Sequence, residues 1–223
     1  DSTIKQLPTH VDWRDFPVMS AVKDQGRCGS CWAFASTAVI ESHVAINTNK
    51  LFDLSPQQIA ACAPNPDHCG GAGNCAGATA ELAFDYVASS AGLLEEFQYP
   101  YASYYGVESS CSIPSAGIPK AQIGGYVKLP SNDYSSLMNA VAKIGPIAIS
   151  VDASSWHAYS SGIFNGCNFI VAVPNNMIGI NDNFCFFNKF QSKSVGLIGG
   201  QKAGISCNLV WFTIFSKEVK ISF

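Results

Sequence analysis

The sequence has few charged residues and no concentration of one charge sign. Charged side chains make up 13% of the 223 residues, and 13 Lys and Arg stand against 16 Asp and Glu. Without a basic cluster, neither nucleic acid nor an anionic membrane is an expected partner. No apolar run approaches the ~20 residues that span a bilayer. The chain begins DSTIKQLPTHVDWR, without a basic and apolar leader, so we expect any signal peptide or pro-segment to have been removed or never present.

Cysteine, by contrast, is abundant. The chain contains nine cysteines, which is high for a cytosolic enzyme and common in secreted or lumenal proteins, where disulfides persist. Nine is an odd number, so at least one thiol remains if all the others pair within the chain. That thiol is either a nucleophile or a buried cysteine that acts as a small hydrophobic residue.

The first half of the chain has mainly helical patterns. Residues 31–46, CWAFASTAVIESHVAI, are apolar on nearly every face, which is typical of a buried helix. Ser55 and Pro56 have the N-cap and first-position signature of a second helix, and residues 78–89 predict a third. Residues 64–75 are a loop rich in Pro, Gly and Cys, which we expect disulfides to stiffen.

The pattern changes toward strands from about residue 114. Residues 123–129 and 147–153 are predicted strands, and residues 134–145 between them are a predicted short helix. A helical lobe followed by a β-rich lobe leaves a cleft between the two as the expected site.

The motif QGRCGSCWAF allows three interpretations. A redox pair would use Cys28 and Cys31, but the βαβ context of such a pair is absent. A zinc site needs two close Cys pairs or a Cys and His pair, whereas Cys69 and Cys75 lie in a glycine loop with a single histidine beside them. The third interpretation is a catalytic nucleophile with its oxyanion donor.

The nucleophile interpretation accounts for more of the motif. If Cys31 begins the buried helix, its sulfur lies at the positive end of the helix dipole, which favours the reactive thiolate. Gln25 precedes it across a turn that contains glycine and can direct its side-chain N–H toward the same point. Together with the backbone N–H of Cys31 it would form a two-donor oxyanion hole. Cys28 would then pair elsewhere and hold this loop against the helix.

The segment LPTHVDWRDFPVMSAVKDQGRCGSCWAFAS resembles the mature N-terminus of the papain family of cysteine peptidases, in its cathepsin L-like form. The resemblance covers roughly residues 7–167 and continues through LSPQQIAACA, NCAGATAELAFDYV, YPYAS, GGYVKLP, VAKIGPIAISVDAS and WHAYSSGIFNGC. It implies an α+β, papain-like two-lobe fold, with a helical left lobe, a β-barrel-like right lobe and an active-site cleft between them. Residues 1–223 are then one peptidase domain, with lobes at about 11–113 and about 114–223.

The resemblance also implies roles for single residues. Cys31 is the expected nucleophile and Gln25 the expected oxyanion donor. The implied disulfides are Cys28 to Cys75 and Cys62 to Cys111. The partners of Cys69, Cys167, Cys185 and Cys207 stay open, with Cys167 to Cys207 as a weaker expectation. The candidate substrate-binding residues are Ala78, Ala80, Ser150 and His157. Neither a cofactor nor a metal ion is implied.

The family mechanism also needs a histidine base and an orienting asparagine, and here the sequence departs from the family. Alignment puts Val173 at the histidine position and Leu197 at the asparagine position. Neither side chain can exchange a proton or orient a base.

No other histidine is a convincing replacement. His43 lies twelve residues after Cys31 on one predicted helix, about 18 Å away. His10 and His68 are interpreted as surface or structural residues. His157 borders the leaving-group side of the cleft in the family, so it is a weak candidate for a surrogate base.

Two explanations are open for the departure of the residues after about 167, the C-terminal tail, from the family. One is a catalytically inactive homologue that acts as a binding or structural protein. The other is that the residue identities after about 167 are misassigned, and the joint loss of His, Asn and two tryptophans favours this second explanation. A frameshift would destroy the glycine spacing, yet Gly179, Gly200 and Gly204 fall at family positions.

The expected function is therefore a cysteine endopeptidase that acts through an acyl-enzyme on Cys31. Its expected partners are peptide or protein substrates and protein inhibitors of cysteine peptidases. We expect a monomer in a lysosome-like or vacuole-like compartment, or a secreted protein.

Overall fold

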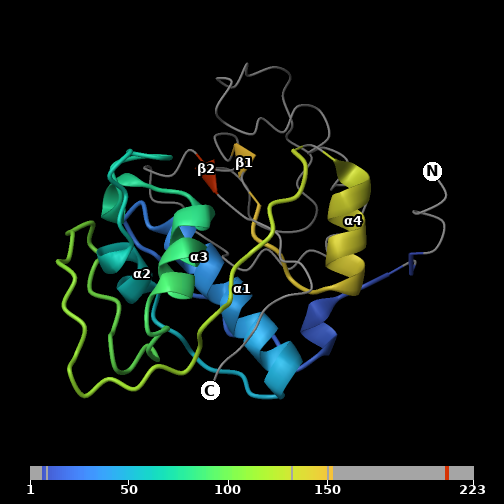
Figure 1. Cartoon of the computed structure of the whole chain (residues 1–223), viewed down its shortest axis with the longest axis horizontal. Helices are drawn as coiled ribbons and strands as arrows, with labels where there is room; N and C mark the ends of the chain where they lie inside the picture. Colours follow the sequence, from blue (N-terminus) through green and yellow to red (C-terminus); the bar gives the residue numbers. More distant parts are fainter. Residues whose placement is uncertain (1–6, 9, 132, 150, 153–208, 211–223) are drawn as a thin grey trace.

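The computed structural model describes residues 7, 8, 10–131, 133–149, 151, 152, 209 and 210. Its elements, in chain order, are the 3-10 helix η2 (Trp13–Asp15), α1 (Cys31–Thr48), α2 (Pro56–Cys62), the 3-10 helix η3 (Asn74–Ala76), α3 (Ala80–Ser89), α4 (Tyr134–Lys143), β1 (Val151–Asp152) and β2 (Leu209–Val210). α2 and α3 pack against α1 and against each other. In the view of Figure 1, α4 lies on the opposite side of α1.

Helix α1 is buried on nearly all sides because small and apolar residues occupy every face. Residues 31–45 are all buried, as the sequence predicts. Ser36, Thr37 and Ser42 each donate to the backbone carbonyl four residues earlier, at 2.8 to 3.0 Å. These bonds avoid the cost of burying an unpaired hydroxyl. The helix ends at Thr48 and is followed by the C-cap Asn49, whose φ of 57° is a left-handed conformation that Asn tolerates.

Helices α2 and α3 begin at side-chain caps. The Ser55 hydroxyl accepts the N–H of Gln58 just ahead of Pro56, as the sequence predicts. Thr79 caps α3 by accepting the N–H of Leu82. Each cap satisfies a backbone donor that the first helical turn leaves without a partner.

A single hydrophobic core joins these helices to the second half of the chain. Trp32 from α1 and Phe84 from α3 are fully buried in it. Ala121, Ile123 and Ala148 belong to the same cluster and are at most 3% exposed. Residues on both sides of the expected lobe boundary therefore share one core.

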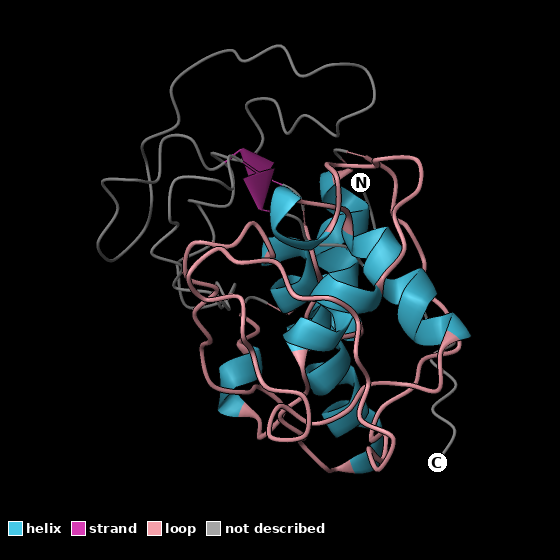
Figure 2. Cartoon of the chain, turned by 90° about the vertical axis from the view of Figure 1, so that its left-hand side faces the viewer, coloured by secondary structure: helices cyan, strands magenta, loops and turns pink. Residues whose placement is uncertain are grey.

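Within the residues that the structure describes, the second half contains less strand structure than the sequence predicts. β1 and β2 pair antiparallel, Val151 opposite Val210, at one edge of the helical part (Figure 2). Residues 123–129 form no strand in the described structure, so that prediction is wrong here. A strand requires a backbone partner as well as a favourable pattern, and the pairing found near this segment is a single bridge from Ala121 to Leu93.

No helix in the described ranges is long and apolar enough to cross a membrane.

A buried histidine connects α1 to the chain that follows α4. Nε2 of His43 lies 2.9 Å from the carbonyl oxygen of Pro146. Because a carbonyl oxygen can only accept, Nε2 carries the proton. Burial lowers the pKa of His43, and the bond to Pro146 raises it by less. The folded protein therefore favours the neutral imidazole.

On acidification, we expect the free energy of unfolding to fall less in His43→Gln than in the parent protein. Below the ordinary pKa of 6.5 the unfolded chain gains a proton at His43 that the folded chain resists, so the free energy of unfolding falls as pH falls toward the folded pKa. Gln keeps an N–H donor but does not titrate. Urea unfolding at about pH 7 and about pH 5 measures the difference, with the exposed His10→Gln as the matched control. An unchanged pH dependence in His43→Gln would contradict the assignment.

Candidate active site

Cys31 is the first residue of α1 and follows the N-cap Ser30 directly. It retains its thiol and is only 2% exposed. The N-terminus of an 18-residue helix concentrates backbone N–H groups and the positive end of the helix dipole at this point. A thiolate is favoured in such a place, which suits a nucleophile.

One disulfide holds the loop before this helix start, and a second lies at the last residue of α2. Cys28 is bonded to Cys75, and Cys62 is bonded to Cys111. The structure thus contains both pairs that the family resemblance implies. Because Cys28 is bonded to Cys75 and not to Cys31, a redox pair in the motif is excluded.

The glycine loop does not form a zinc site. Cys75 is committed to a disulfide, and Cys69 is an exposed thiol. Among the residues that the structure describes, no group of three metal-ligating side chains comes together.

The loop that carries Cys28 approaches the 75–77 backbone closely. The N–H of Gly29 donates to the carbonyl oxygen of Cys75 at 2.9 Å. A Cβ at Gly29 would come within 2.3 Å of that oxygen, so the close approach requires glycine here. On the other side, Nε1 of Trp32 donates to the carbonyl oxygen of Asn74 at 3.3 Å. The start of α1 is thereby fixed against η3.

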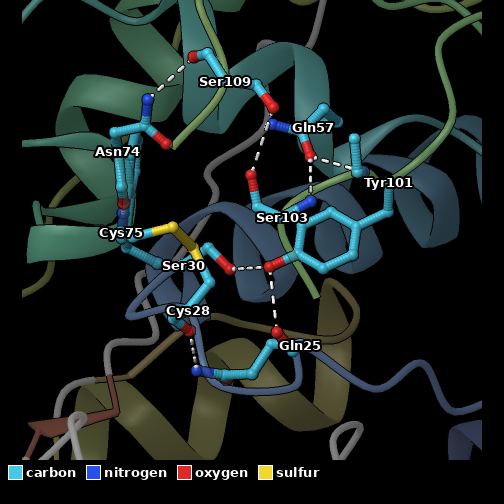
Figure 3. Close-up of a disulfide and its surroundings, with 11 residues drawn as sticks. Gln25, Cys28, Ser30, Gln57, Asn74, Cys75, Tyr101, Ser103 and Ser109 are labelled. Carbon is cyan, nitrogen blue, oxygen red and sulfur yellow. Dashed lines mark hydrogen bonds between the residues drawn. A yellow bond between two sulfur atoms is a disulfide. The ribbon is translucent and has the colours of Figure 1, made fainter. Parts of the chain in front are cut away.

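Gln25 lies beside this loop and is 1% exposed. Its Nε2 donates to the carbonyl oxygen of Cys28 at 2.7 Å (Figure 3). An amide nitrogen carries two hydrogens, and this bond uses one of them. The Cys28 carbonyl therefore fixes where the Gln25 amide points, as an oxyanion donor requires.

Of the other site residues predicted from the sequence, two are buried in the core and the rest lie outside the described residues. Ala78 and Ala80 are buried in the hydrophobic core, 1% and 0% exposed. Ser150, His157, Val173 and Leu197 lie outside the described residues, as do Cys167, Cys185 and Cys207.

The three histidines of the helical half are not brought to Cys31. His43 lies on α1 twelve residues after Cys31, and its side chain is hydrogen-bonded to the carbonyl oxygen of Pro146. His10 and His68 are exposed, in the N-terminal arm and in the glycine loop. Their interpretation as structural or surface residues agrees with these positions.

Sequence reasoning missed Tyr101. Its hydroxyl donates to the backbone carbonyl of Gln25 at 2.9 Å and lies 2.7 Å from Oγ of Ser30. The motif YPYAS contains this tyrosine, but nothing in the local pattern shows that it reaches a site more than 70 residues earlier.

Comparison with known proteins gives one consistent family. The family profile described as papain family cysteine protease matches residues 7–179. Cathepsin K of Gallus gallus is 39% identical over 167 residues, which cover 73% of this chain and 47% of the relative. The chain spans about half the length, or less, of the curated relatives it matches.

Solved structures give the same result. A recombinant stem bromelain precursor matches with a TM-score of 0.66 and 36% identity, covering 75% of this chain and 52% of that chain. The bromelain protease from Ananas comosus, in complex with the E64 inhibitor, matches with a TM-score of 0.63 and 37% identity, covering 72% and 69%.

Proposed function

Since the chain belongs to the papain family of cysteine proteases and has the papain-like two-lobe α+β fold, we propose that it hydrolyses peptide bonds through an acyl-enzyme on Cys31. The observation that carries this proposal is the position of a retained, buried thiol at the first residue of α1. The neighbouring Cys28 is committed to a disulfide, which leaves Cys31 as the reactive member of the motif.

The proposed reaction uses two donors at the start of α1. The Cys31 thiolate attacks the scissile carbonyl carbon, a sulfur–carbon bond forms, and the carbonyl π pair moves onto oxygen. The Gln25 amide and the backbone N–H of Cys31 donate to that oxygen. When the carbonyl re-forms, the carbon–nitrogen bond breaks and the amine leaves with the proton that the Cys31 thiol lost on ionising. Water then hydrolyses the thioester and restores the thiol.

The sequence has no histidine at the position where the family has its general base. The family's histidine position reads Val173 and its asparagine position reads Leu197. A chain with these residues favours a second candidate function, a catalytically inactive homologue that binds peptides or proteins in its cleft. The thiol and its donors would persist in such a protein, while turnover would not.

One experiment distinguishes the two functions. Natural protein is assayed with a dipeptidyl fluorogenic substrate, and its tail is sequenced by mass spectrometry. Turnover with a bell-shaped pH profile, by a protein whose tail reads His at 173 and Asn at 197, would support the peptidase. A tail with Val173 and Leu197 and no turnover would support the inactive homologue. Ordinary, Cys31-dependent turnover with that same tail would show that the base has been placed wrongly.

We expect the main specificity pocket to reject acidic side chains. By the family resemblance, Ala80 and Ser150 align with the pocket that receives the residue second from the scissile bond, and both are small and uncharged. Ala80 is fully buried in the described structure, and Ser150 lies outside it. Bulky apolar residues should be preferred there over Asp and Glu by about 1 to 3 kcal/mol, roughly 5- to 150-fold in kcat/KM. A peptide library varied at this position measures the preference. A profile that favours Asp or Glu would contradict the prediction.

The domain organisation that we propose is one peptidase domain over residues 1–223, with lobes at about 11–113 and 114–223. It is supported by the shared core, in which Ala121, Ile123 and Ala148 pack with the helices.

The proposed partners are peptide or protein substrates and protein inhibitors of cysteine peptidases, with the chain acting as a monomer. A bromelain structure holds the E64 inhibitor, so E64 is a suitable probe for inhibitor binding by this chain. The proposed location is a lysosome-like or vacuole-like compartment, or outside the cell. Two disulfides support it, because they persist in oxidising surroundings.

A further inference from the structure

The hydroxyl of Tyr101 connects the two segments that carry the oxyanion donors. It donates to the backbone carbonyl of Gln25 at 2.9 Å, and Oγ of Ser30 lies 2.7 Å from it. Ser30 immediately precedes Cys31. Figure 3 shows the tyrosine ring reaching in between these two segments.

The direction of these hydrogen bonds is fixed by chemistry. A phenol has one proton, and the Gln25 carbonyl can only accept it. Ser30 must therefore be the donor in its contact with Tyr101. The result is a chain of two bonds that runs from the Ser30 hydroxyl through the Tyr101 hydroxyl to the Gln25 backbone.

Ser30 does not use its side chain in the usual way for its position. Serine is among the preferred N-cap residues because its oxygen accepts an N–H of the first helical turn. At the start of α1, Ser30 makes no such capping bond. Its hydroxyl is engaged with Tyr101 instead, so it does not accept from the N–H groups around Cys31.

Tyr101 is itself held firmly by the helical half of the chain. Its backbone N–H donates to Oε1 of Glu96 at 2.8 Å. Oε1 of the buried Gln57, on α2, accepts the N–H groups of the next two residues at 2.9 and 3.1 Å. The ring packs edge-on against Phe34, with centroids 4.8 Å apart. The hydroxyl is therefore a fixed point against which the two segments are aligned.

We propose that Tyr101 is a positioning residue for the oxyanion site, which sets the Gln25 amide relative to the backbone N–H of Cys31. The inference rests on the proposed function, because it assigns both groups to one oxyanion. Loss of the hydroxyl would leave the Cys31 sulfur in place at the helix start and would loosen the turn that carries Gln25. Stabilisation of a developing oxyanion would fall, while simple reactivity of the thiol would not.

Tyr101→Phe in the full chain tests this, since it removes the hydroxyl and keeps the ring on Phe34. Two probes separate the effects. With iodoacetamide, a sulfur–carbon bond forms as iodide leaves, and no oxyanion develops. With an acetyl-dipeptide aldehyde, the Cys31 thiolate adds to the carbonyl carbon and the π pair moves onto oxygen. We expect the aldehyde to bind about tenfold or more weakly, and the iodoacetamide rate to stay within about twofold.

Peptide turnover by Tyr101→Phe should fall in parallel with aldehyde binding. kcat should fall by about tenfold or more while KM changes little, because the interaction is made in the transition state. Tyr104→Phe is the matched control, since its hydroxyl bonds to Asp24 at 3.3 Å and its side chain is exposed. It should match the parent protein in every assay. In a Gln25→Ala background, Tyr101→Phe should add almost nothing, because the group that it positions is gone.

The outcomes separate the inference from the proposed function. If the parent protein binds the aldehyde and Tyr101→Phe behaves like Tyr104→Phe, the positioning role is wrong and the function stands. If Tyr101→Phe slows both probes equally, the tyrosine is merely structural and the inference is again overturned. If the parent protein neither turns over peptides nor binds the aldehyde, the proposed function fails and the positioning role fails with it.

Discussion

Replacing Cys31 with alanine will remove peptide turnover by the natural protein almost completely. The nucleophile forms the covalent intermediate, and loss of a nucleophile in a serine-type triad costs on the order of a million-fold in kcat. Burial of Cys31 in the core around α1 makes alanine a well tolerated replacement in size, so the fold should persist. Turnover of the fluorogenic substrate by both proteins, with circular dichroism to compare their folds, measures the effect.

Cys69→Ala is the control for this prediction. Cys69 is the other retained thiol in the part of the chain that the structure describes, and it is exposed in the glycine loop. Its removal should leave turnover unchanged and should remove one site of alkylation. Substantial turnover in Cys31→Ala, or its loss in Cys69→Ala, would refute the assignment of the nucleophile.

The second large effect is expected at Lys23. Its Nζ lies 2.8 Å from Oε1 of Glu41 and 2.8 Å from the carbonyl oxygen of Leu54, and 2.6 Å from the exposed Asp53. Glu41 is fully buried on α1 and also accepts from Ser20 and from the N–H of Leu54. Lys23 is the positive charge that this buried carboxylate contacts.

We expect Lys23→Met to lower the free energy of unfolding by about 3 kcal/mol, because it leaves the Glu41 carboxylate buried without its ion-pair partner. The double variant Lys23→Met with Glu41→Gln should recover part of this loss. Lys128→Met is the matched control: Lys128 pairs with Glu81 at 3.0 Å but is 54% exposed, so about 0 to 1 kcal/mol is expected. Urea unfolding midpoints measure all three. Equal effects at Lys23 and Lys128 would contradict the role of burial.

The pKa of Lys23 gives a further check. Burial lowers it, but the carboxylates of Glu41 and Asp53 together outweigh burial and leave the pKa raised. The contribution of the Lys23 charge is therefore present below the ordinary lysine value of 10.5 and is lost as pH rises through the folded pKa. Burial raises the pKa of Glu41, so the ion pair is also lost as pH falls through the pKa of that carboxyl. In Lys23→Met, this alkaline loss should be smaller.

The helices were predictable because their signals are local. The cap at Ser55, the proline after it and the all-round burial of α1 each depend on a few neighbouring residues. The pairing of Cys28 with Cys75 followed from family resemblance, which supplies long-range information that spacing does not. The absence of a strand at 123–129 was not predictable from the local pattern, because strand pairing depends on a distant backbone.

In the candidate site, Cys31 and Gln25 could be selected from the sequence, whereas Tyr101, which contacts their segments, could not. Cys31 and Gln25 stand in one short motif, so the roles proposed for them can be inferred from the sequence. Tyr101 reaches Ser30 and Gln25 over 71 and 76 residues of chain, and its contribution is a single hydroxyl. Such a contact depends on how Gln57 and Glu96 hold the 101–103 segment, and no local pattern encodes it.

The two disulfides overlap along the chain, since the second begins at Cys62 before the first closes at Cys75. A single backbone cut anywhere between residues 28 and 111 is therefore spanned by at least one covalent cross-link. A protein with the proposed peptidase activity would meet other copies of itself, and its exposed loops would be natural places for self-digestion. A molecule nicked in residues 64–75 would keep both fragments and migrate as one species on a gel, until a reducing agent released them.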